Sequence, residues 1–314
     1  MNILVVIEDS RGTMHRMSKE AIAGAQKIGG NITALVIGDN ADALSNELSS
    51  IDIEKTLIVK HEIVPSYNAD GYKEIIAKVI IDTSPDMVIV GHTYQTRDFM
   101  PRVSAKLDVP FVPDIIGIDQ GIYTKQVLNS KLNASISSSE DLIILSFQSA
   151  CFSEEDMVKG TSTSESLDID IDSSMIKSRS EEPFQESAAE VDLESAELIV
   201  SVGRGIEKEE NISIAFDLAK EIGAEVSASR PVVDAGWLPS FRQVGSSGST
   251  VSPKLYFSLG VSGAIQHVVG MKGSKNILAI NKDPDAPIFE IADYAVIGDV
   301  IEIIPKLVET LNNS

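Results

Sequence analysis

The sequence predicts an α/β protein with two domains, each an open and mostly parallel sheet with flanking helices. Three observations lead to this prediction. Short apolar runs alternate with helical segments in both halves of the chain, which is the rhythm of parallel sheets. That rhythm breaks once, in an acidic, Ser-rich segment at residues 153–196. The length of 314 residues suffices for two domains with separate cores.

The first half opens the alternation of strands and helices. Apolar runs predict strands over residues 3–7, 32–37, 55–59, 87–90 and 142–147. Helices are expected near residues 17–27, after the turn at 38–40, over 72–81 and near 101–107. The uninterrupted apolar run at 87–90 is typical of a strand that is buried on both faces of a parallel sheet.

The acidic segment separates the two halves. We interpret residues 153–196 as the end of the first domain followed by a connector. The alternation of acid and isoleucine over residues 168–172 predicts an exposed edge strand. We place the boundary near residue 190, so the N-terminal domain covers residues 1–190 and the C-terminal domain covers 191–314.

The second half restarts the pattern. Strands are expected over residues 197–202, 225–228, 255–259, 276–280 and 294–297. Helices are expected over residues 211–223, from the turn at 261–263 through 269, and over 300–311. A Gly- and Ser-rich stretch at 229–252 matches no regular element. Such a stretch between strands is a candidate for binding loops.

Charge and composition exclude several functions. The net charge is −21, of which residues 1–195 carry −16 and residues 196–314 carry −5. This field disfavours nucleic acid and anionic lipid, and it places an anionic ligand more plausibly in the second half. No apolar run reaches the roughly 18–20 residues of a membrane span. The first residues lack a basic leader, and Cys151 is the single cysteine; we therefore expect a cytoplasmic protein without a zinc or iron–sulfur site.

Loops suited to phosphate or amide recognition follow most strands of the second half. In open α/β sheets, ligands bind beyond the carboxyl ends of the strands. The candidate loops are Gly203-Arg204-Gly205, Ser229-Arg230, Gly245-Ser246-Ser247-Gly248, residues 262–267, Asn281 and Gly298-Asp299.

Three of these features suit a ligand, and each has a plainer alternative. Glycines beside Arg204 let the backbone approach a phosphate or carboxylate that the guanidinium can bind, but they also build ordinary tight turns. At Ser262-Gly263 we expect Ser262 to cap a helix whose free N–H groups suit a pyrophosphate, although every helix start has such donors. His267 can donate to a ring carbonyl, or it can be a satisfied helix residue.

Motifs for bond cleavage are missing from the sequence. It contains no GxSxG, no GxGxxG and no metal motif. The loops therefore favour a carrier of a nucleotide-type cofactor over a hydrolase.

A dense run of motifs lies between residues 229 and 299. Its segments are residues 229–239 (SRPVVDAGWLP), 243–245 (QVG), 260–267 (GVSGAIQH), 270–272 (GMK) and 280–289 (INKDPDAPIF). They resemble the alpha subunit of electron transfer flavoproteins, and Gly203-Arg204-Gly205 fits as well. In the first half, Gly91, Arg97-Asp98 and Pro101-Arg102 are similar to the family's N-terminal domain.

The resemblance implies a heterodimer with a smaller beta subunit and one FAD in the C-terminal, flavin-dinucleotide-binding domain of this chain. AMP or a second FAD is then expected in the beta subunit. Electrons would come from flavin dehydrogenases, or from a beta-subunit flavin, and go to a quinone oxidoreductase or another acceptor. The setting would be beta-oxidation or anaerobic electron metabolism.

The resemblance also implies the FAD contacts. Arg204, Ser262, Gly263, Ala264, Ile265 and Gln266 would hold the pyrophosphate and neighbouring groups. Ser229 and Arg230 would lie beside the isoalloxazine ring, and Gln243, Val244, Gly245 and Ser246 near its edge. Ser247 would bring its hydroxyl to flavin N5, and His267 would reach the O2 side. Asn281, Asp299 and Val300 would bind the adenosine part.

Two departures from the family pattern stand out. Many members have Gln-Thr where this chain has Ser246-Ser247, so the hydroxyl at the second position is kept and the amide at the first is lost. Residues 124–129 lack the family's usual glycine. Two alternatives remain open, which are the alpha subunit of an electron-bifurcating, NADH-linked complex and a nucleotide-binding module with no redox role.

Overall fold

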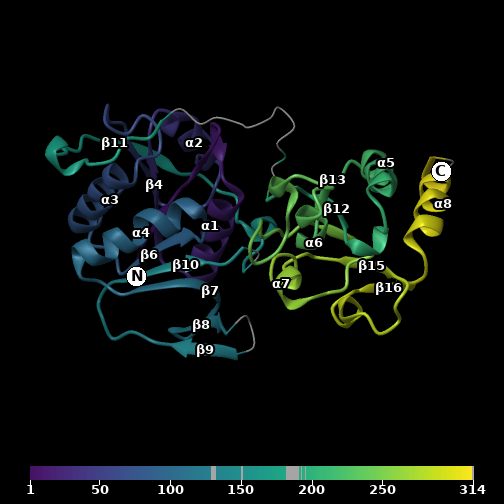
Figure 1. The fold of residues 1–314 in the computed structure, drawn as a ribbon. Helices are drawn as coiled ribbons and strands as arrows, with labels where there is room; N and C mark the ends of the chain where they lie inside the picture. Colours follow the sequence, from purple (N-terminus) through teal and green to yellow (C-terminus); the bar gives the residue numbers. More distant parts are fainter. Residues whose placement is uncertain (129–131, 150, 182–190, 192, 195, 313–314) are drawn as a thin grey trace. The chain divides into compact units, whose positions relative to one another are not determined.

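The chain divides into two compact units, Met1–Pro183 and Phe184–Ser314, in the computed structural model (Figure 1). The structure describes residues 1–128, 132–149, 151–181, 191, 193–194 and 196–312. The boundary expected near residue 190 lies outside these residues.

The first unit contains a nine-stranded sheet with the order β11-β5-β4-β1-β6-β10-β7-β8-β9. Its central strands are β1 (Asn2–Val6), β4 (Asn31–Ile37), β5 (Lys55–Val59), β6 (Met87–Gly91) and β10 (Ile143–Phe147). The outer strands are β7 (Phe111–Asp119), β8 (Ile122–Val127), β9 (Leu132–Ile136) and β11 (Thr163–Leu167). All neighbours pair in parallel except β7–β8 and β8–β9. A mostly parallel sheet with flanking helices is thereby confirmed for this unit.

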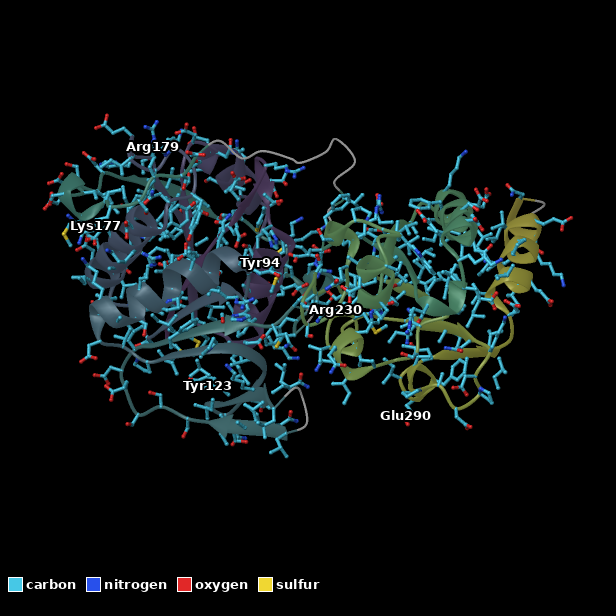
Figure 2. The ribbon with its side chains drawn as sticks, in the orientation of Figure 1. Tyr94, Tyr123, Lys177, Arg179, Arg230 and Glu290 are labelled. Carbon is cyan, nitrogen blue, oxygen red and sulfur yellow. The ribbon has the colours of Figure 1, made fainter. Side chains whose placement is uncertain are left out.

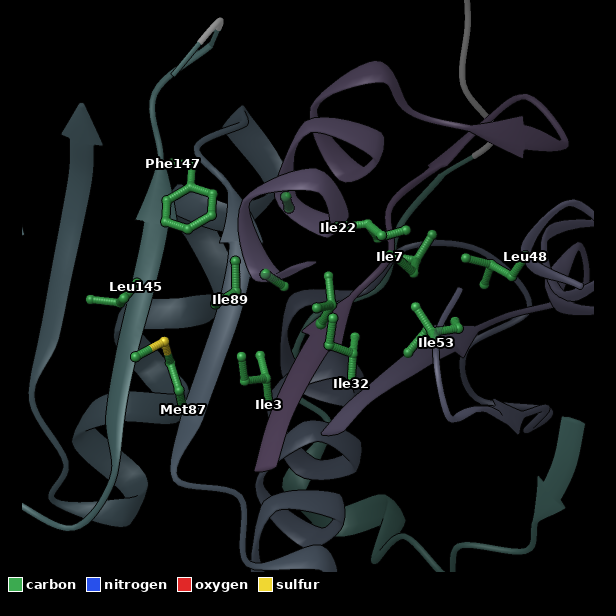
Figure 3. Packing of buried hydrophobic residues seen from close by; sticks show 14 of the residues in the cluster. Ile3, Ile7, Ile22, Ile32, Leu48, Ile53, Met87, Ile89, Leu145 and Phe147 are labelled. Carbon is green, nitrogen blue, oxygen red and sulfur yellow. The ribbon is translucent and has the colours of Figure 1, made fainter. Parts of the chain in front are cut away.

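Helices cover both faces of this sheet. They are α1 (Arg16–Ile28), α2 (Ala41–Leu48), α3 (Ala69–Thr83) and α4 (Tyr94–Leu107), and a small hairpin joins β2 (Asp9–Ser10) to β3 (Thr13–Met14). Ile22 of α1 and Leu48 of α2 pack with Ile3 and Ile89 on one face (Figure 3). Side chains of α3 and α4 pack against the other face, which carries Leu4 of β1 and Val88 of β6. Each of these residues is the strand neighbour of Ile3 or Ile89 and points to the opposite side. The alternation of side chains along each strand therefore feeds two separate cores.

The acidic segment differs from the prediction. The edge strand is β11, which pairs with β5 over residues 163–167, and residues 168–172 form no strand. Ile169 and Ile171 are buried in the core on the α3 face rather than exposed. The isoleucines therefore anchor the chain as it leaves the sheet. Short turns η1 (Glu154–Asp156) and η2 (Ser173–Met175) flank β11 in sequence.

The second unit contains a five-stranded sheet with the order β13-β12-β14-β15-β16. The strands are β12 (Leu198–Val202), β13 (Glu225–Ala228), β14 (Leu255–Leu259), β15 (Ile277–Asn281) and β16 (Tyr294–Ile297), and all pair in parallel. The helices are α5 (Ile212–Ile222), α6 (Arg230–Asp234), α7 (Ile265–Val268) and α8 (Val300–Asn312). Single turns are η3 (Arg204–Ile206), η4 (Glu209–Asn211), η5 (Ser240–Arg242) and η6 (Pro287–Glu290).

Strand alternation also builds two apolar layers here. Val200 and Phe257 face α5 and α8 in one cluster. Ile199 and Tyr256 face the opposite side and pack with Val244 and Met271. In the described part of the chain, no helix combines the length and the apolar character that crossing a bilayer requires.

Candidate cofactor-binding site

A cavity of about 560 Å³ opens at the carboxyl ends of the strands in the second sheet. Its wall comes from the residues that follow β12, β13 and β14 and from the end of β15. The chain runs from β12 outward to β13 and returns across the sheet to β14 on the other side. The cavity therefore lies at the topological switch point, where open α/β sheets bind ligands. Its volume is within the usual range for small-molecule sites, about 300–1,000 Å³.

Glycines bring two loops into backbone contact at this switch point. Gly203 N–H donates to the Leu259 carbonyl at 2.8 Å, and Gly205 N–H donates to the Gly260 carbonyl at 2.9 Å. A Cβ on Gly203 would lie 2.3 Å from the Gly260 oxygen, which no side chain tolerates. The glycines of the Gly203-Arg204-Gly205 motif therefore serve close loop packing, and Arg204 is held at the mouth of the crevice between them.

The loop at residues 243–248 is tied to the start of α7. The Ser246 N–H donates to the Gln266 carbonyl at 2.7 Å. Gly245 has a φ of +141° and packs against Gly270, where a Cβ would lie 2.4 Å from the Gly245 nitrogen. Gln243 Nε2 donates to Ser247 Oγ at 3.0 Å. These bonds fix the backbone of the loop while Ser246 and Ser247 stay exposed on the cavity wall.

Two arginines supply positive charge to the wall. Arg204 is exposed, and no ion pair involves it within the described residues. Arg230, which Figure 2 labels, begins α6, is 67% exposed, and lies 3.3 Å from Asp234. Asp283 is the acidic residue of the wall. The charged groups at the cavity are thus mostly cationic in a protein of strongly negative net charge, which favours an anionic ligand.

His267 is one of three buried polar residues of the wall, together with Ser229 and Gln243. It is 6% exposed, and its Nε2 lies 3.0 Å from the Tyr256 hydroxyl. Burial lowers the pKa of His267 to about 4, against the opposing effect of the Val244 backbone carbonyl. The imidazole is therefore neutral at pH 7. Its Nδ1 is buried and has no hydrogen-bond partner among the described residues, so a bound ligand can supply one.

The structure brings most of the predicted cofactor-binding residues together on this wall. Those that line the cavity are Arg204, Ser229, Arg230, Gln243, Val244, Gly245, Ser246, Ser247, Ser262, Ala264, Gln266, His267 and Asn281. Their convergence from separate loops supports the predicted site, although their contacts with a cofactor stay predictions.

Two predicted residues near α7 lie outside the wall. Gly263 has a φ of +86° and packs on η6, where a Cβ would lie 2.2 Å from the Ile288 nitrogen. Ile265 is 49% exposed. The expectation that Ser262 caps a longer helix is wrong, because Ala264 is the N-cap residue and α7 is a single turn. The left-handed turn at Gly263 redirects the chain before the helix begins.

Asp299 and Val300 also lie outside the wall. The Asp299 carboxylate accepts the Ile301 N–H at 2.9 Å at the start of α8 and pairs with Lys282 at 2.9 Å. Val300 is buried in the α5–α8 core. Lys282 also pairs with Glu207 at 2.5 Å, so it links the loops that follow β12, β15 and β16. Neighbouring Asn281 donates from Nδ2 to the Val261 carbonyl at 2.9 Å.

The wall includes residues to which the sequence analysis assigned no cofactor contact. They are Pro231, Gly260, Val261, Asp283, Ala286 and Pro287. Gly260 and Val261 follow β14 directly and open the GVSGAIQH motif, so their place at a strand end was the signal that could have found them. The turn at residues 283–287 belongs to the INKDPDAPIF motif, but its Asp, Pro and Ala residues are ordinary in turns and predicted no ligand contact by themselves.

A parallel sheet with a glycine-lined, cationic cavity at its switch point is typical of α/β proteins that bind nucleotide-type ligands. Comparison with known proteins narrows the class. The family model described as the electron transfer flavoprotein FAD-binding domain matches residues 192–272. The model described as the electron transfer flavoprotein domain matches residues 3–171.

Curated relatives match along almost the whole chain. The electron transfer flavoprotein subunit alpha of Bacillus subtilis (strain 168) is 34% identical, with 98% of this chain and 96% of the relative covered. The probable mitochondrial subunit alpha of Caenorhabditis elegans is 33% identical, with 98% and 93% covered. Protein FixB of Clostridium saccharobutylicum is 31% identical, with 98% and 95% covered. The chain belongs to the electron transfer flavoprotein alpha subunit family.

Proposed function

We propose that this chain is the FAD-binding subunit of a heterodimeric electron carrier that it forms with a smaller beta subunit. The carrier accepts electrons from flavin dehydrogenases, or from a flavin of the beta subunit, and passes them to a downstream acceptor such as a quinone oxidoreductase. The observation that carries this proposal is the cavity at the switch point, whose wall gathers the family's expected FAD contacts from separate loops. The complex is expected in the cytoplasm.

The residues of the wall fit an FAD. Arg204 has no ion pair among the described residues and suits the pyrophosphate, together with Ser262, Ala264 and Gln266. The backbone contact between the glycine loops leaves the crevice free of side chains near that position. The orphaned Nδ1 of His267 provides a donor or acceptor for a ring edge. A bound FAD would supply one- and two-electron redox chemistry that no side chain of this chain offers.

The chain's own residues would tune that chemistry through charge and hydrogen bonding. Arg230 places a cation at the mouth of the cavity, where it favours negative charge on the ring. The Ser247 hydroxyl accepts from Gln243 and therefore has its own hydrogen to donate toward N5. His267 would act as a neutral group, because burial holds its pKa near 4. The imidazole would then ease electron acceptance as a neutral ring with a single N–H, and it would not need to take up a second proton.

The residues expected at the adenosine part already make contacts within the protein. Asn281 lines the cavity, yet its Nδ2 and Oδ1 already bond Val261 and Asp283. Asp299 and Val300 lie beyond the wall. We propose that Asn281 and the neighbouring backbone receive the adenosine, with Asp299 acting through its ion pair with Lys282. This assignment follows the family resemblance.

A cofactor count on the purified complex tests the proposal. The chain is co-expressed with its beta subunit, and released flavin and nucleotide are quantified beside the visible spectrum. We expect one FAD per copy of this chain and AMP in the partner. A colourless complex without FAD contradicts the proposal. A second FAD together with reduction by NADH identifies the bifurcating alternative instead, and intact FAD that no dehydrogenase reduces supports a module without a redox role.

A further inference from the structure

A row of buried hydroxyls lies in the second sheet. Ser201 on β12 is in register with Ser227 on β13 and with Ser258 on β14. All three side chains have an exposed fraction of 0%. The Ser258 hydroxyl has no hydrogen-bond partner within the described residues, and the hydroxyls of Ser201 and Ser227 have only the nearby Tyr256 hydroxyl to bond. Each unpaired buried hydroxyl costs about 1–3 kcal/mol. Such a row in the middle of a core calls for a physical role.

Tyr256 lies on the same face of the sheet, two positions before Ser258 on β14. Its side chain has an exposed fraction of 0%, and its hydroxyl is 3.0 Å from His267 Nε2. Burial raises the pKa of Tyr256, and the nearby hydroxyls of Ser201 and Ser227 oppose that rise. The phenol therefore keeps its proton and lies between the serine row and the imidazole.

The chemistry of the pair decides which group donates. A phenol is a stronger acid than the N–H of a neutral imidazole, and an unprotonated imidazole nitrogen is a good acceptor. The serine hydroxyls beside Tyr256 can meanwhile donate to its oxygen. Donation from Tyr256 to Nε2 leaves the single proton of the neutral ring on Nδ1. Nδ1 belongs to a residue of the cavity wall and makes no hydrogen bond in the described part of the chain, although the Val244 carbonyl lies near the ring.

We propose that Tyr256 is a positioning residue that fixes His267 as the Nδ1–H tautomer and so holds a neutral N–H donor ready for the ring of the cofactor. The inference rests on the proposed function, because the ring is that of the FAD expected in the cavity. Tyr256 does not line the wall and acts only through His267. A donor that is oriented beforehand stabilises negative charge on the ring without reorganisation.

Nitrogen NMR on the heterodimer with ¹⁵N-labelled histidine reads the tautomer directly. This chain has only four histidines, and the His267 signals are assigned by their loss in His267→Gln. We expect a protonated Nδ1 in the wild-type protein. A protonated Nε2 overturns the inference. The measurement needs no bound flavin, so an FAD-free wild-type complex sinks the proposed function while the tautomer still decides whether Tyr256 acts as inferred.

The variant Tyr256→Phe removes only the hydroxyl oxygen and tests whether that hydroxyl sets the His267 tautomer and the flavin potential. We expect mixed tautomers at His267 and a roughly tenfold lower preference of the protein for reduced over oxidised FAD. For a one-electron couple that equals a potential lowered by about 59 mV. An unchanged tautomer, or an unchanged potential with FAD retained, overturns the inference.

Tyr72→Phe is the matched control. Tyr72 is buried in the first unit, and its hydroxyl donates to the Ile37 carbonyl at 3.3 Å. Its loss should change stability and leave both the His267 signals and the flavin potential at wild-type values. A potential shift in Tyr72→Phe as large as that in Tyr256→Phe would mean that any lost tyrosine hydroxyl has this effect, and it overturns the inference.

Discussion

Replacing Gly260 by alanine should separate the two loops that form the crevice. Gly260 has a φ of +62°, and an added Cβ would lie 2.6 Å from the Gly205 Cα. The left-handed backbone alone costs a non-glycine residue about 1–2 kcal/mol. The clash against backbone adds about 1–3 kcal/mol, the usual cost of overpacking. We expect a total loss of about 2–5 kcal/mol, and the loop movement should reduce the FAD content of the complex.

Gly223→Ala isolates the cost of the left-handed backbone from the cost of the clash. Gly223 ends α5 with a φ of +68°, and a Cβ added there would meet no atom within 4 Å. This variant should therefore lose only about 1–2 kcal/mol and keep its FAD. Urea unfolding followed by circular dichroism compares the two variants, and absorbance at the flavin band reports retention. If Gly260→Ala and Gly223→Ala lose equal stability and both retain FAD, the argument from backbone contact is refuted.

Three further predictions concern the wall. Arg204→Ala should weaken FAD binding about tenfold or more, because the substitution removes a charge-assisted hydrogen bond worth about 1.5–3 kcal/mol. Fluorescence titration of the deflavinated complex measures the affinity, with Lys220→Ala at an exposed position of α5 as the control. Equal affinities of the two variants would contradict the prediction. Ser247→Ala should shift the flavin midpoint potential by tens of millivolts, which is about 59 mV for each tenfold change in the relative affinity for reduced and oxidised FAD. Spectroelectrochemistry compares this variant with Ser249→Ala, because Ser249 does not line the cavity. Equal potentials in the two variants would refute the contact assigned to Ser247. Burial lowers the pKa of His267 to about 4, so its contribution to stability is complete above about pH 6.5, the unfolded value, and is lost as pH falls toward 4. Between pH 7.5 and 5.0, His267→Gln should lose about 2 kcal/mol less than the wild type in urea titrations, and identical losses would show that His267 is not buried as a neutral group.

Strands could be predicted from the sequence where short runs rich in apolar residues lie between turn residues. The runs at residues 55–59, 225–228, 255–259 and 294–297 match β5, β13, β14 and β16. Turn residues bound these runs. Burial in a parallel sheet accounts for the apolar residues of β5, β13 and β14, whereas β16 is exposed and was recognised from its apolar residues alone. The same reasoning located the strand-end loops, and those loops supplied most of the cavity wall.

Elements that depend on pairing with distant residues could not be predicted. Residues 163–167 have the sequence TSESL and form an edge strand only because β5 offers its free side. The antiparallel extension of β7, β8 and β9 is largely half-buried or exposed and lacks a clear apolar pattern. The brevity of α7 follows from the left-handed Gly263 and its contact with η6. None of these contacts has a local sequence signal.

The pairing of Tyr256 with His267 shows the same limit inside the site. In the sequence, Tyr256 stands in an apolar run and has the pattern of an ordinary core residue. Its hydroxyl reaches His267 only through the packing of β14 against α7, and the serine row depends on the register of three strands. The sequence could therefore predict which residues surround the ligand, but not which buried groups hold them.

A crystal structure of the co-purified heterodimer tests the central claim most directly. The account predicts density for one FAD in the cavity beyond β12 and β14, with its pyrophosphate beside Arg204 and its ring between Ser247 and His267. Density for the flavin elsewhere in this chain, with Arg204 and His267 more than about 6 Å from it and thus beyond hydrogen-bond reach, would contradict the account.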